Sequence, residues 1–287
     1  MTRMAASTDG AAAFRACERI TRTRAANFYY GIRLLPPEKR RALCAVYAFA
    51  RCVDDVGDGD LPSETKLHRL DDARRSLDRV DAASPDPVLA ALGHARRRFD
   101  LPLDAFRDLI DGVEMDVVGT RYERFEDLVR YCRRVAGSVG RLSVGVFEAR
   151  EPDRAAVLAD DLGVAMQLTN ILRDVREDFG LGRVYLPRGD LRAFGLDPVH
   201  GFDPERAPAA LIRFEAGRAR AWFVRGLTLL PLLDARSASC VRAMTGIYRR
   251  ILERIDRAPT EVLRRRISLP AWEKAWVAAR SLAGAGA

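Results

Sequence analysis

The sequence is poor in the residues that build metal clusters and disulfide frameworks. Its 287 residues include five Cys and three His. The cysteines are odd in number and widely scattered, and no CxxC pair or Cys/His cluster occurs. This pattern supports neither a zinc site nor a disulfide framework. We therefore expect a reducing, cytoplasmic setting, and we assign the three histidines no functional role.

Long apolar runs are also missing. No uncharged run approaches the ~18–20 residues that a membrane-spanning helix needs, and the apolar stretch from Ala42 to Ala50 stops at Arg51. The first ten residues contain no continuous apolar segment, so we do not expect a secretory signal.

Lysine is scarce although the chain is basic. Only three of the 48 positively charged residues are Lys, the rest being Arg, and the net charge is +8 with a pI near 9.6. Arg suits bidentate phosphate contacts, so a phosphate-bearing partner is allowed. One alternative function is a nucleic-acid-binding module, but no recognition-helix motif and no interleaving of aromatic and basic residues occur, and we predict no nucleic-acid partner. A helical scaffold protein is a further alternative.

Strand-like alternation is rare, and apolar residues recur at helical spacing. The sequence predicts helices over about 38–56, 64–80, 86–98, 102–117, 124–147, 151–179, 205–232, 236–257 and 270–283. The predicted fold class is all-α, with a flexible N-terminal tail at 1–13 and a single all-helical domain at 14–287. The Gly/Pro-punctuated stretch from Gly180 to Pro208 is a candidate lid or site loop.

The first informative cluster ends the helix predicted at 38–56. Tyr47, Arg51, Asp54 and Asp58 fall within about 60° of one another around a helix. One face therefore carries a phenol, a guanidinium and two carboxylates. Asp55 points off this face and is expected to orient an Arg or a water molecule.

The second cluster ends the helix predicted at 151–179. Gln167, Asn170, Asp174 and Asp178 share one polar face at steps of three, four and four. We call Asp54 and Asp58 the first ladder, and Asp174 and Asp178 the second ladder.

Both ladders lie where the helix dipole disfavours carboxylates, and like charges four residues apart repel. A compensating cation would resolve this conflict. Oxygen-only ligands favour a hard ion, and Mg²⁺ commonly takes one or two carboxylates together with substrate phosphates. The alternative is a pair of solvated acidic faces.

Four blocks give the chain a family resemblance. Tyr47–Asp58 matches YxFxRxxDDxxD, and Gln167–Pro187 matches QLTNILRDVxEDxxxGRxYLP. The other two blocks are Tyr131–Gly140 and Ile247–Leu252, the latter followed by Arg264–Arg266. In this order they resemble the squalene and phytoene synthase family, whose members join two prenyl diphosphates head to head. The resemblance extends from about residue 27 to 278 and implies a single-domain, isoprenoid-synthase-type helical bundle with a central substrate cavity.

Two further segments suggest a subfamily. Asn27–Pro36 and Arg141–Val144 look most like bacterial presqualene diphosphate synthases of hopanoid pathways. This likeness implies condensation of two farnesyl diphosphates to presqualene diphosphate with release of diphosphate. The alternatives are a phytoene synthase that uses geranylgeranyl diphosphate, and a dehydrosqualene or squalene synthase. No GxGxxG fingerprint is visible, and NADPH is not expected.

The resemblance also implies residue roles. Two or three Mg²⁺ ions, bound with the substrate diphosphate, would be held by Asp54, Asp58, Asn170, Asp174 and Asp178. The implied catalytic set comprises Asp54, Asp58, Asp174, Asp178, Tyr47, Arg51 and Tyr131. The implied substrate-binding set comprises Asn27, Tyr30, Arg51, Gln167, Asn170, Arg173, Tyr248 and Arg265.

Several of these residues have simpler interpretations. Tyr47, Tyr131 and Tyr248 either line the carbocation region or pack in the core with one hydrogen bond. Arg51 and Arg173 either contact phosphate or form surface salt bridges. Asn27 stands where many relatives carry a Ser that helps to bind diphosphate, and its amide is also able to donate a hydrogen bond.

Two other segments carry open alternatives. The small-residue run Val135–Gly140 costs helix propensity, nearly 1 kcal/mol per Gly, which close approach of a prenyl chain or of a neighbouring helix would explain. From Arg236 to Arg266 nine Arg face three acids. This segment is a solvated face, a site of phosphate capture, or a region attracted to anionic lipid. We expect a cytoplasmic protein, peripheral at the inner face of the membrane, with downstream isoprenoid enzymes as partners.

Overall fold

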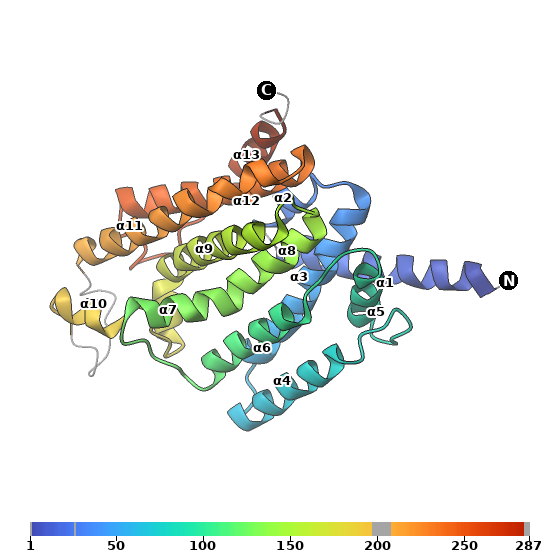
Figure 1. Ribbon diagram of the computed structural model, residues 1–287. Helices are drawn as coiled ribbons and strands as arrows, with labels where there is room; N and C mark the ends of the chain where they lie inside the picture. The colour runs from blue at the N-terminus through green and yellow to red at the C-terminus, as the bar shows by residue number, and fades with distance from the viewer. Residues whose placement is uncertain (1, 26, 197–207, 284–287) are drawn as a thin grey trace.

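The computed structural model describes residues 2–25, 27–196 and 208–283, and every regular element within these ranges is helical (Figure 1). The predicted all-α class is therefore confirmed. In chain order the helices are α1 (Thr2–Arg24), α2 (Tyr29–Ile32), α3 (Pro37–Asp58), α4 (Ser63–Leu77), α5 (Pro87–Arg96), α6 (Leu103–Val117), α7 (Phe125–Cys132), η1 (Arg133–Gly137), α8 (Ser138–Phe147), α9 (Pro152–Gly180), α10 (Arg188–Ala193), α11 (Ala209–Gly226), η3 (Leu227–Leu232), α12 (Ala235–Arg257) and α13 (Ala271–Ala283).

Local sequence explains where several helices begin. Pro37 occupies the first turn of α3, where its missing N–H costs nothing. The Asp86 carboxylate accepts hydrogen bonds from the backbone of Val88 and Leu89 and so caps α5. Asp234 caps α12 in the same way. These signals are short-range, and the predicted helices that carry them begin within a few residues of the observed ones.

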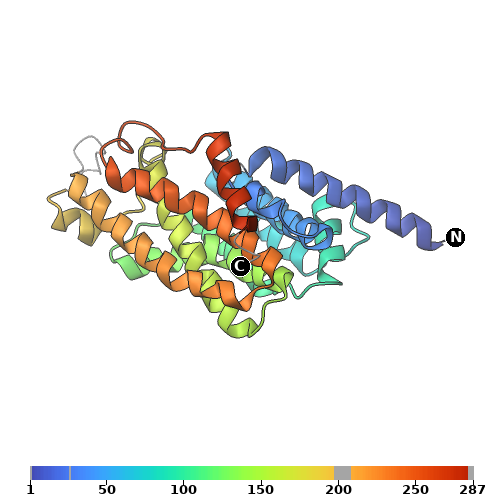
Figure 2. The same ribbon diagram turned by 90° about the horizontal axis from the view of Figure 1, so that it is seen from above.

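Helix α9 is the centre of the bundle and packs against α8, α11 and α12 (Figures 1 and 2). By length and composition it is the one described helix that is apolar enough to cross a membrane. However, 67% of its most apolar 18-residue stretch is buried inside the protein. Its apolar sides pack against these neighbouring helices, as expected for the central helix of a bundle.

The N-terminal segment differs from the expectation. Residues 2–13, predicted as a loose tail, belong to α1, which packs against α3 and α5. A side chain at Gly10 would collide with the ring of His94 on α5. The Ala-rich sequence of this segment favours helix, and the docking of its second half on α3 and α5 explains why the helix is continuous.

The helix predicted over 124–147 is interrupted. It consists of α7, the π-helical turn η1 and α8. A Cβ atom at Gly137 would collide with the Asp160 side chain, and one at Gly140 with the backbone of Ala159, both on α9. The glycines therefore allow close approach of a neighbouring helix, and the π turn fits the chain to it.

Two other predicted ranges are subdivided. The helix predicted to end at 232 closes as the 3₁₀ helix η3, which contains Pro231. The short helix α10 lies within the predicted loop 180–208. Residues 197–207 of that loop lie outside the described residues.

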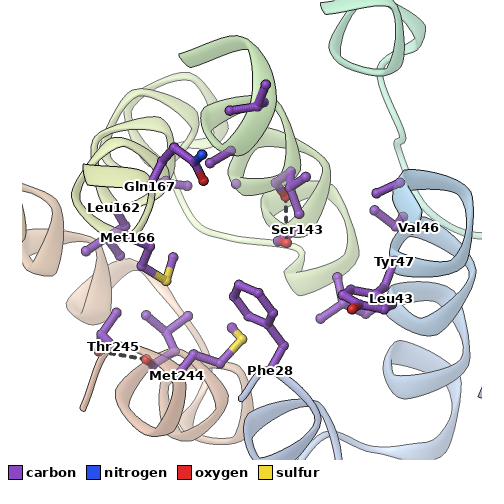
Figure 3. Close-up of a pocket in the computed structure, with 18 of the residues that line it drawn as sticks. Phe28, Leu43, Val46, Tyr47, Ser143, Leu162, Met166, Gln167, Met244 and Thr245 are labelled. Atoms are coloured by element: carbon purple, nitrogen blue, oxygen red, sulfur yellow. Dashed lines mark hydrogen bonds between the residues drawn. The ribbon is translucent and has the colours of Figure 1, made fainter. Parts of the chain in front are cut away.

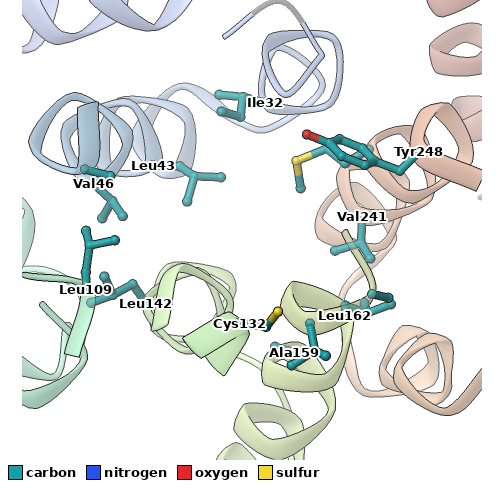
Figure 4. Packing of buried hydrophobic residues seen from close by; sticks show 14 of the residues in the cluster. Ile32, Leu43, Val46, Leu109, Cys132, Leu142, Ala159, Leu162, Val241 and Tyr248 are labelled. Atoms are coloured by element: carbon teal, nitrogen blue, oxygen red, sulfur yellow. The ribbon is translucent and has the colours of Figure 1, made fainter. Parts of the chain in front are cut away.

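The hydrophobic core runs through the whole bundle. One cluster of buried apolar side chains extends from Ala13 on α1 to Val277 on α13. Figure 4 shows part of it, where Val46 of α3, Leu109 of α6 and Leu142 of α8 lie together. These three positions place α3, α6 and α8 around one side of the cavity described next.

Candidate active site

A cavity of about 210 Å³ lies among α3, α8, α9 and α12, as the fold expectation required. Most of its wall is apolar, and Figure 3 shows Phe28, Leu43, Met166 and Met244 around it. Its polar lining includes Asp54 of the first ladder together with Gln167 and Asn170 of the second polar face. The two polar faces therefore reach the same cavity from different helices, the first through Asp54 and the second through Gln167 and Asn170.

The small-residue run also contributes to this cavity. Val135, Ala136, Val139 and Gly140 line it, together with Gly163 of α9. The close approach of α9 at Gly137 and Gly140 accounts for the run, and the approach of a prenyl chain to its cavity-lining residues stays a prediction.

The first ladder is paired with an arginine of its own helix. Arg51 donates from Nε to Asp55 at 2.8 Å, and its guanidinium lies 3.9 Å from the Asp54 carboxylate and 3.6 Å from that of Asp58. Arg24 of α1 also reaches Asp55 at 2.8 Å. Asp55 thus orients Arg51, as expected from its position off the main face.

The second ladder is paired with an adjacent arginine and with a distant one. Arg173 donates to both oxygens of Asp174, at 2.8 and 2.5 Å. Arg266, from the segment after α12, reaches the same carboxylate at 2.9 Å. Arg173 is only 9% exposed. A surface salt bridge is therefore the wrong description of Arg173.

One arginine joins the two ladders. Arg183, just after α9, donates to Asp58 at 3.0 Å and to the carbonyl of Gly57 at 3.4 Å. Because Asp58 ends α3 and Arg183 follows α9, this contact ties together the C-terminal ends of the two ladder helices. Arg183 falls within the quoted family block, but its spacing from the ladder residues did not predict this contact.

A fifth carboxylate, outside the ladders, lies near members of both. Asp116, at the end of α6, accepts hydrogen bonds from the hydroxyls of Tyr131 at 2.9 Å and Tyr185 at 2.8 Å. The Tyr131 and Tyr185 rings stack with centroids 5.2 Å apart. Sequence reasoning missed Asp116 and Tyr185, although Asp116 has the same signal as the ladders, namely an acid at the C-terminal end of a helix.

One carboxylate in each ladder has a pKa well above its ordinary value. Burial raises the pKa of Asp54 to about 7, against the opposing effect of Arg51, with Asp58 and Asp116 adding to the rise. The Asp54 side chain is 43% accessible, but this surface faces the cavity, so the carboxylate is still shielded from bulk water. Burial and then Asp174 likewise raise the pKa of Asp178 to about 7. Burial also raises the pKa of Asp116, opposed by its two tyrosine hydrogen bonds.

The donor set fits Mg²⁺. Asn170 Oδ1 is buried without a hydrogen-bond partner at the edge of the cavity, while its amide nitrogen donates to Gln167 Oε1 at 3.2 Å. An unsatisfied amide oxygen that lines the same cavity as the Asp54 carboxylate is a ligand suited to a hard cation. Among the described residues, no three His, Cys, Asp or Glu side chains form a metal-holding group by themselves. The ladder residues and Asn170 would thus bind the ion jointly with diphosphate oxygens.

The three predicted tyrosines lie in different surroundings. Tyr47 lines the cavity, and burial raises its pKa to about 12. Tyr248 is buried, and its ring lies 5.5 Å from that of Phe28, which lines the cavity. Tyr131 is buried behind the ladders and holds Asp116, so its contacts favour core packing with one hydrogen bond.

Of the eight implied substrate-binding residues, Gln167 and Asn170 line the described cavity and the other six do not. Asn27 and Tyr30 are half-buried near α2 and do not line the cavity. Arg265 points to Glu261, at 2.7 Å, and its side chain is 75% exposed. The neighbouring Arg266 is the one that reaches the second ladder, because consecutive residues in this segment point to different sides.

Known proteins share this chain's sequence and fold. Residues 21–273 match the model of the family described as squalene/phytoene synthase. The chain is 52% identical over 276 residues to a phytoene synthase of Mycobacterium tuberculosis, covering 94% of this chain and 91% of that protein. It is 39% identical to a presqualene diphosphate synthase of Sinorhizobium fredii, covering 79% and 82%.

A solved structure extends the likeness to three dimensions. A dehydrosqualene synthase in complex with a ligand superposes with a TM-score of 0.87 at 28% identity, covering 97% of this chain and 98% of that one. The all-helical isoprenoid synthase fold predicted from the sequence is thereby confirmed. On the family match, the sequence identities and the paired acidic ladders around one cavity, this chain belongs to the squalene/phytoene synthase family.

Proposed function

We propose that this protein is a phytoene synthase, which condenses two geranylgeranyl diphosphates head to head and releases diphosphate. The observation that carries the proposal is the 52% identity to a phytoene synthase along nearly the whole of both chains. The identity to a presqualene diphosphate synthase is 39% over a shorter stretch. The sequence-based preference for farnesyl diphosphate is revised accordingly.

The cavity supports the coarser chemistry of the family, in which an allylic C–O bond breaks and a second prenyl chain attacks the resulting cation. Its apolar wall excludes water, which would otherwise capture the cation. Phe28 and Tyr47 present aromatic rings at the cavity surface, and such a ring stabilises a nearby cation by ~0.5–2 kcal/mol. The cavity walls therefore shield the carbocation from water and stabilise its positive charge.

The polar end supports departure of the diphosphate. Arg51, Arg173 and Arg266 lie beside the ladder carboxylates, where their guanidinium groups are placed to contact phosphate oxygens as negative charge develops. Mg²⁺ bound by the ladders and Asn170 would supply Lewis-acid stabilisation of the leaving diphosphate. Arg183 keeps the first ladder aligned with the second through Asp58.

A presqualene diphosphate synthase is the second candidate. It is favoured by the resemblance of Asn27–Pro36 and Arg141–Val144 to that subfamily and by the Sinorhizobium relative. The two candidates share the ladders and differ in the length of prenyl chain that the cavity accepts.

Product analysis distinguishes the candidates. Purified protein is incubated with Mg²⁺ and no NADPH, with either geranylgeranyl or farnesyl diphosphate, and the products are identified by mass spectrometry. We expect a hydrocarbon built from both geranylgeranyl chains, and diphosphate release that depends on Mg²⁺. Turnover of farnesyl diphosphate alone, to presqualene diphosphate, would replace the proposal with the second candidate. Absence of diphosphate release from both substrates would refute both.

A further inference from the structure

Helix α13 has its polar and apolar sides in unusual places. Its outward side carries Trp272, which is 71% exposed, Trp276, which is 43% exposed, and Leu282. The other exposed residues of this helix are four alanines and Arg280. A surface helix normally presents charged and polar residues to water, and here it presents tryptophan, leucine and alanine. We call Trp272, Trp276 and Leu282 with these alanines the α13 face.

The inward side of the same helix holds an acidic side chain. Glu273 is 5% exposed and forms ion pairs with Arg250, at 2.7 Å, and with Arg254 of α12. These pairs fix the rotation of α13 about its own axis, because turning the helix would leave Glu273 buried without a cation. The α13 face is therefore held outward by the interactions beneath it.

The α13 face is bordered by positive charge. The guanidinium groups of Arg250 and Arg280 each lie 4.7 Å from the Trp276 ring centroid. A tryptophan face with a basic border is the composition of a helix that lies in the interface of an anionic bilayer.

The position of α13 connects this face to the cavity. α13 lies on the outside of the bundle over α12 (Figures 1 and 2) and also packs against α2. Ile32 of α2 lines the cavity. The short helix α2 therefore lies between α13 and the apolar cavity.

We propose that the α13 face docks the protein on anionic phospholipid membranes, with Trp272 and Trp276 inserted at the headgroup level and Arg250 and Arg280 contacting lipid phosphates. Trp is suited to this level because its ring is apolar and its N–H remains able to hydrogen-bond. The proposal does not depend on which prenyl chain the enzyme uses. It gives a structural form to the sequence-based expectation of membrane contact through the basic C-terminal region.

Vesicle flotation with the full chain tests the proposal. The vesicles are phosphatidylcholine alone or an equimolar mixture of phosphatidylcholine and phosphatidylglycerol. We expect flotation with the mixture, weaker flotation with phosphatidylcholine, and release by added salt. The Trp272→Ser, Trp276→Ser double variant should lower the partition coefficient about tenfold or more. Brominated lipids should quench the tryptophan fluorescence of the wild type more strongly than that of the double variant.

A matched control separates docking from general surface hydrophobicity. Val224 on α11 is 70% exposed, and Val224→Ser should leave flotation unchanged. All variants should keep the wild-type circular dichroism spectrum and the wild-type rate with detergent-dispersed substrate. Equal flotation of the double variant and the wild type would overturn the proposal. Absence of wild-type flotation with the anionic vesicles at low salt would also overturn it, as would a double variant that only turns a dimer into a monomer.

Discussion

The two acidic ladders differ in where their compensating charge comes from. In the first ladder, Arg51 belongs to the same helix and lies within 4 Å of Asp54 and Asp58. In the second ladder, Asp174 is held by its neighbour Arg173 and by Arg266, which is far away along the chain. The closest ion pair of the first ladder, between Asp58 and Arg183 at 3.0 Å, is nevertheless a tertiary contact, whereas that of the second, between Asp174 and Arg173, comes from its own helix.

The two ladders also share an arrangement of one ion-paired carboxylate and one carboxylate with a raised pKa. Each has one carboxylate in an ion pair at hydrogen-bond distance, Asp58 with Arg183 and Asp174 with Arg173. Each has another, Asp54 or Asp178, whose pKa is raised by burial and by neighbouring acids. The polar end of the cavity is therefore arranged for further positive charge, which Mg²⁺ bound with a prenyl diphosphate would supply.

The largest expected effect comes from removing one charge in either ladder. Asp54→Asn and Asp174→Asn should each lower the rate of diphosphate release on the order of 10²–10³-fold, because each removes charge that holds the leaving group's counter-ion. Initial rates at saturating Mg²⁺ measure this. Asp55→Asn is the matched control on the same helix turn and should cost less than about tenfold. Equal losses in all three variants would mean that the ladder faces have no special role.

Breaking the link between the ladders should have the next largest effect. Arg183→Gln removes the hydrogen bonds to Asp58 and Gly57. Charge-assisted bonds of this kind contribute about 1.5–3 kcal/mol, so kcat/KM should fall about tenfold to a hundredfold. Arg192→Gln removes a similar but exposed pair with Glu123 and should be nearly silent in the same assay. A silent Arg183→Gln would contradict the bridging role.

Two neighbouring arginines test the tertiary origin of the second ladder's charge. Arg266→Gln should lower kcat/KM about tenfold, because Arg266 contacts Asp174 and lies where a diphosphate would bind. Arg265→Gln should change kcat/KM less than twofold, because that side chain is exposed and paired with Glu261. Steady-state kinetics on both variants measure these losses. A larger loss of kcat/KM in Arg265→Gln than in Arg266→Gln would favour Arg265, the residue predicted from the sequence.

The smallest expected effect is on stability. The pKa of Asp54 and that of Asp178 are each raised from an ordinary value of 3.8 to about 7. Ionisation therefore costs folding free energy, a cost that begins above about pH 4 and is complete above about pH 7. Without Mg²⁺ we expect this to lower stability at pH 8 relative to pH 5 by about 1 kcal/mol per group after solvent screening.

Thermal unfolding in the presence of a chelator measures this effect, which corresponds to roughly 2–4 °C per kcal/mol. The Asp54→Asn, Asp178→Asn double variant should lose less stability than the wild type between pH 5 and pH 8. Mg²⁺ with inorganic diphosphate should stabilise the wild type more at pH 8 than at pH 5. Parallel stability–pH profiles for the two proteins would show that folding does not raise the pKa of Asp54 and Asp178.

The sequence predicted most helices because their signals are local. The capping Asp234 and the Pro at the start of α3 act within one turn. It did not predict the π turn η1, because that turn depends on how closely α9 approaches Gly137. It also failed for the N-terminal segment, where helix α1 is docked on α3 and α5.

The candidate site divides in the same way. Helical spacing by itself aligned Tyr47, Arg51, Asp54 and Asp58, and likewise Gln167, Asn170, Asp174 and Asp178, because 3.6 residues per turn fixes which side chains share a face. The tertiary structure alone decided that both faces meet at one cavity and that Arg183 joins them. It also brought Arg266, and not Arg265, to Asp174 and placed Asp116 near members of both ladders. These decisions depend on contacts between residues far apart in the chain, and helical periodicity has no information about such contacts.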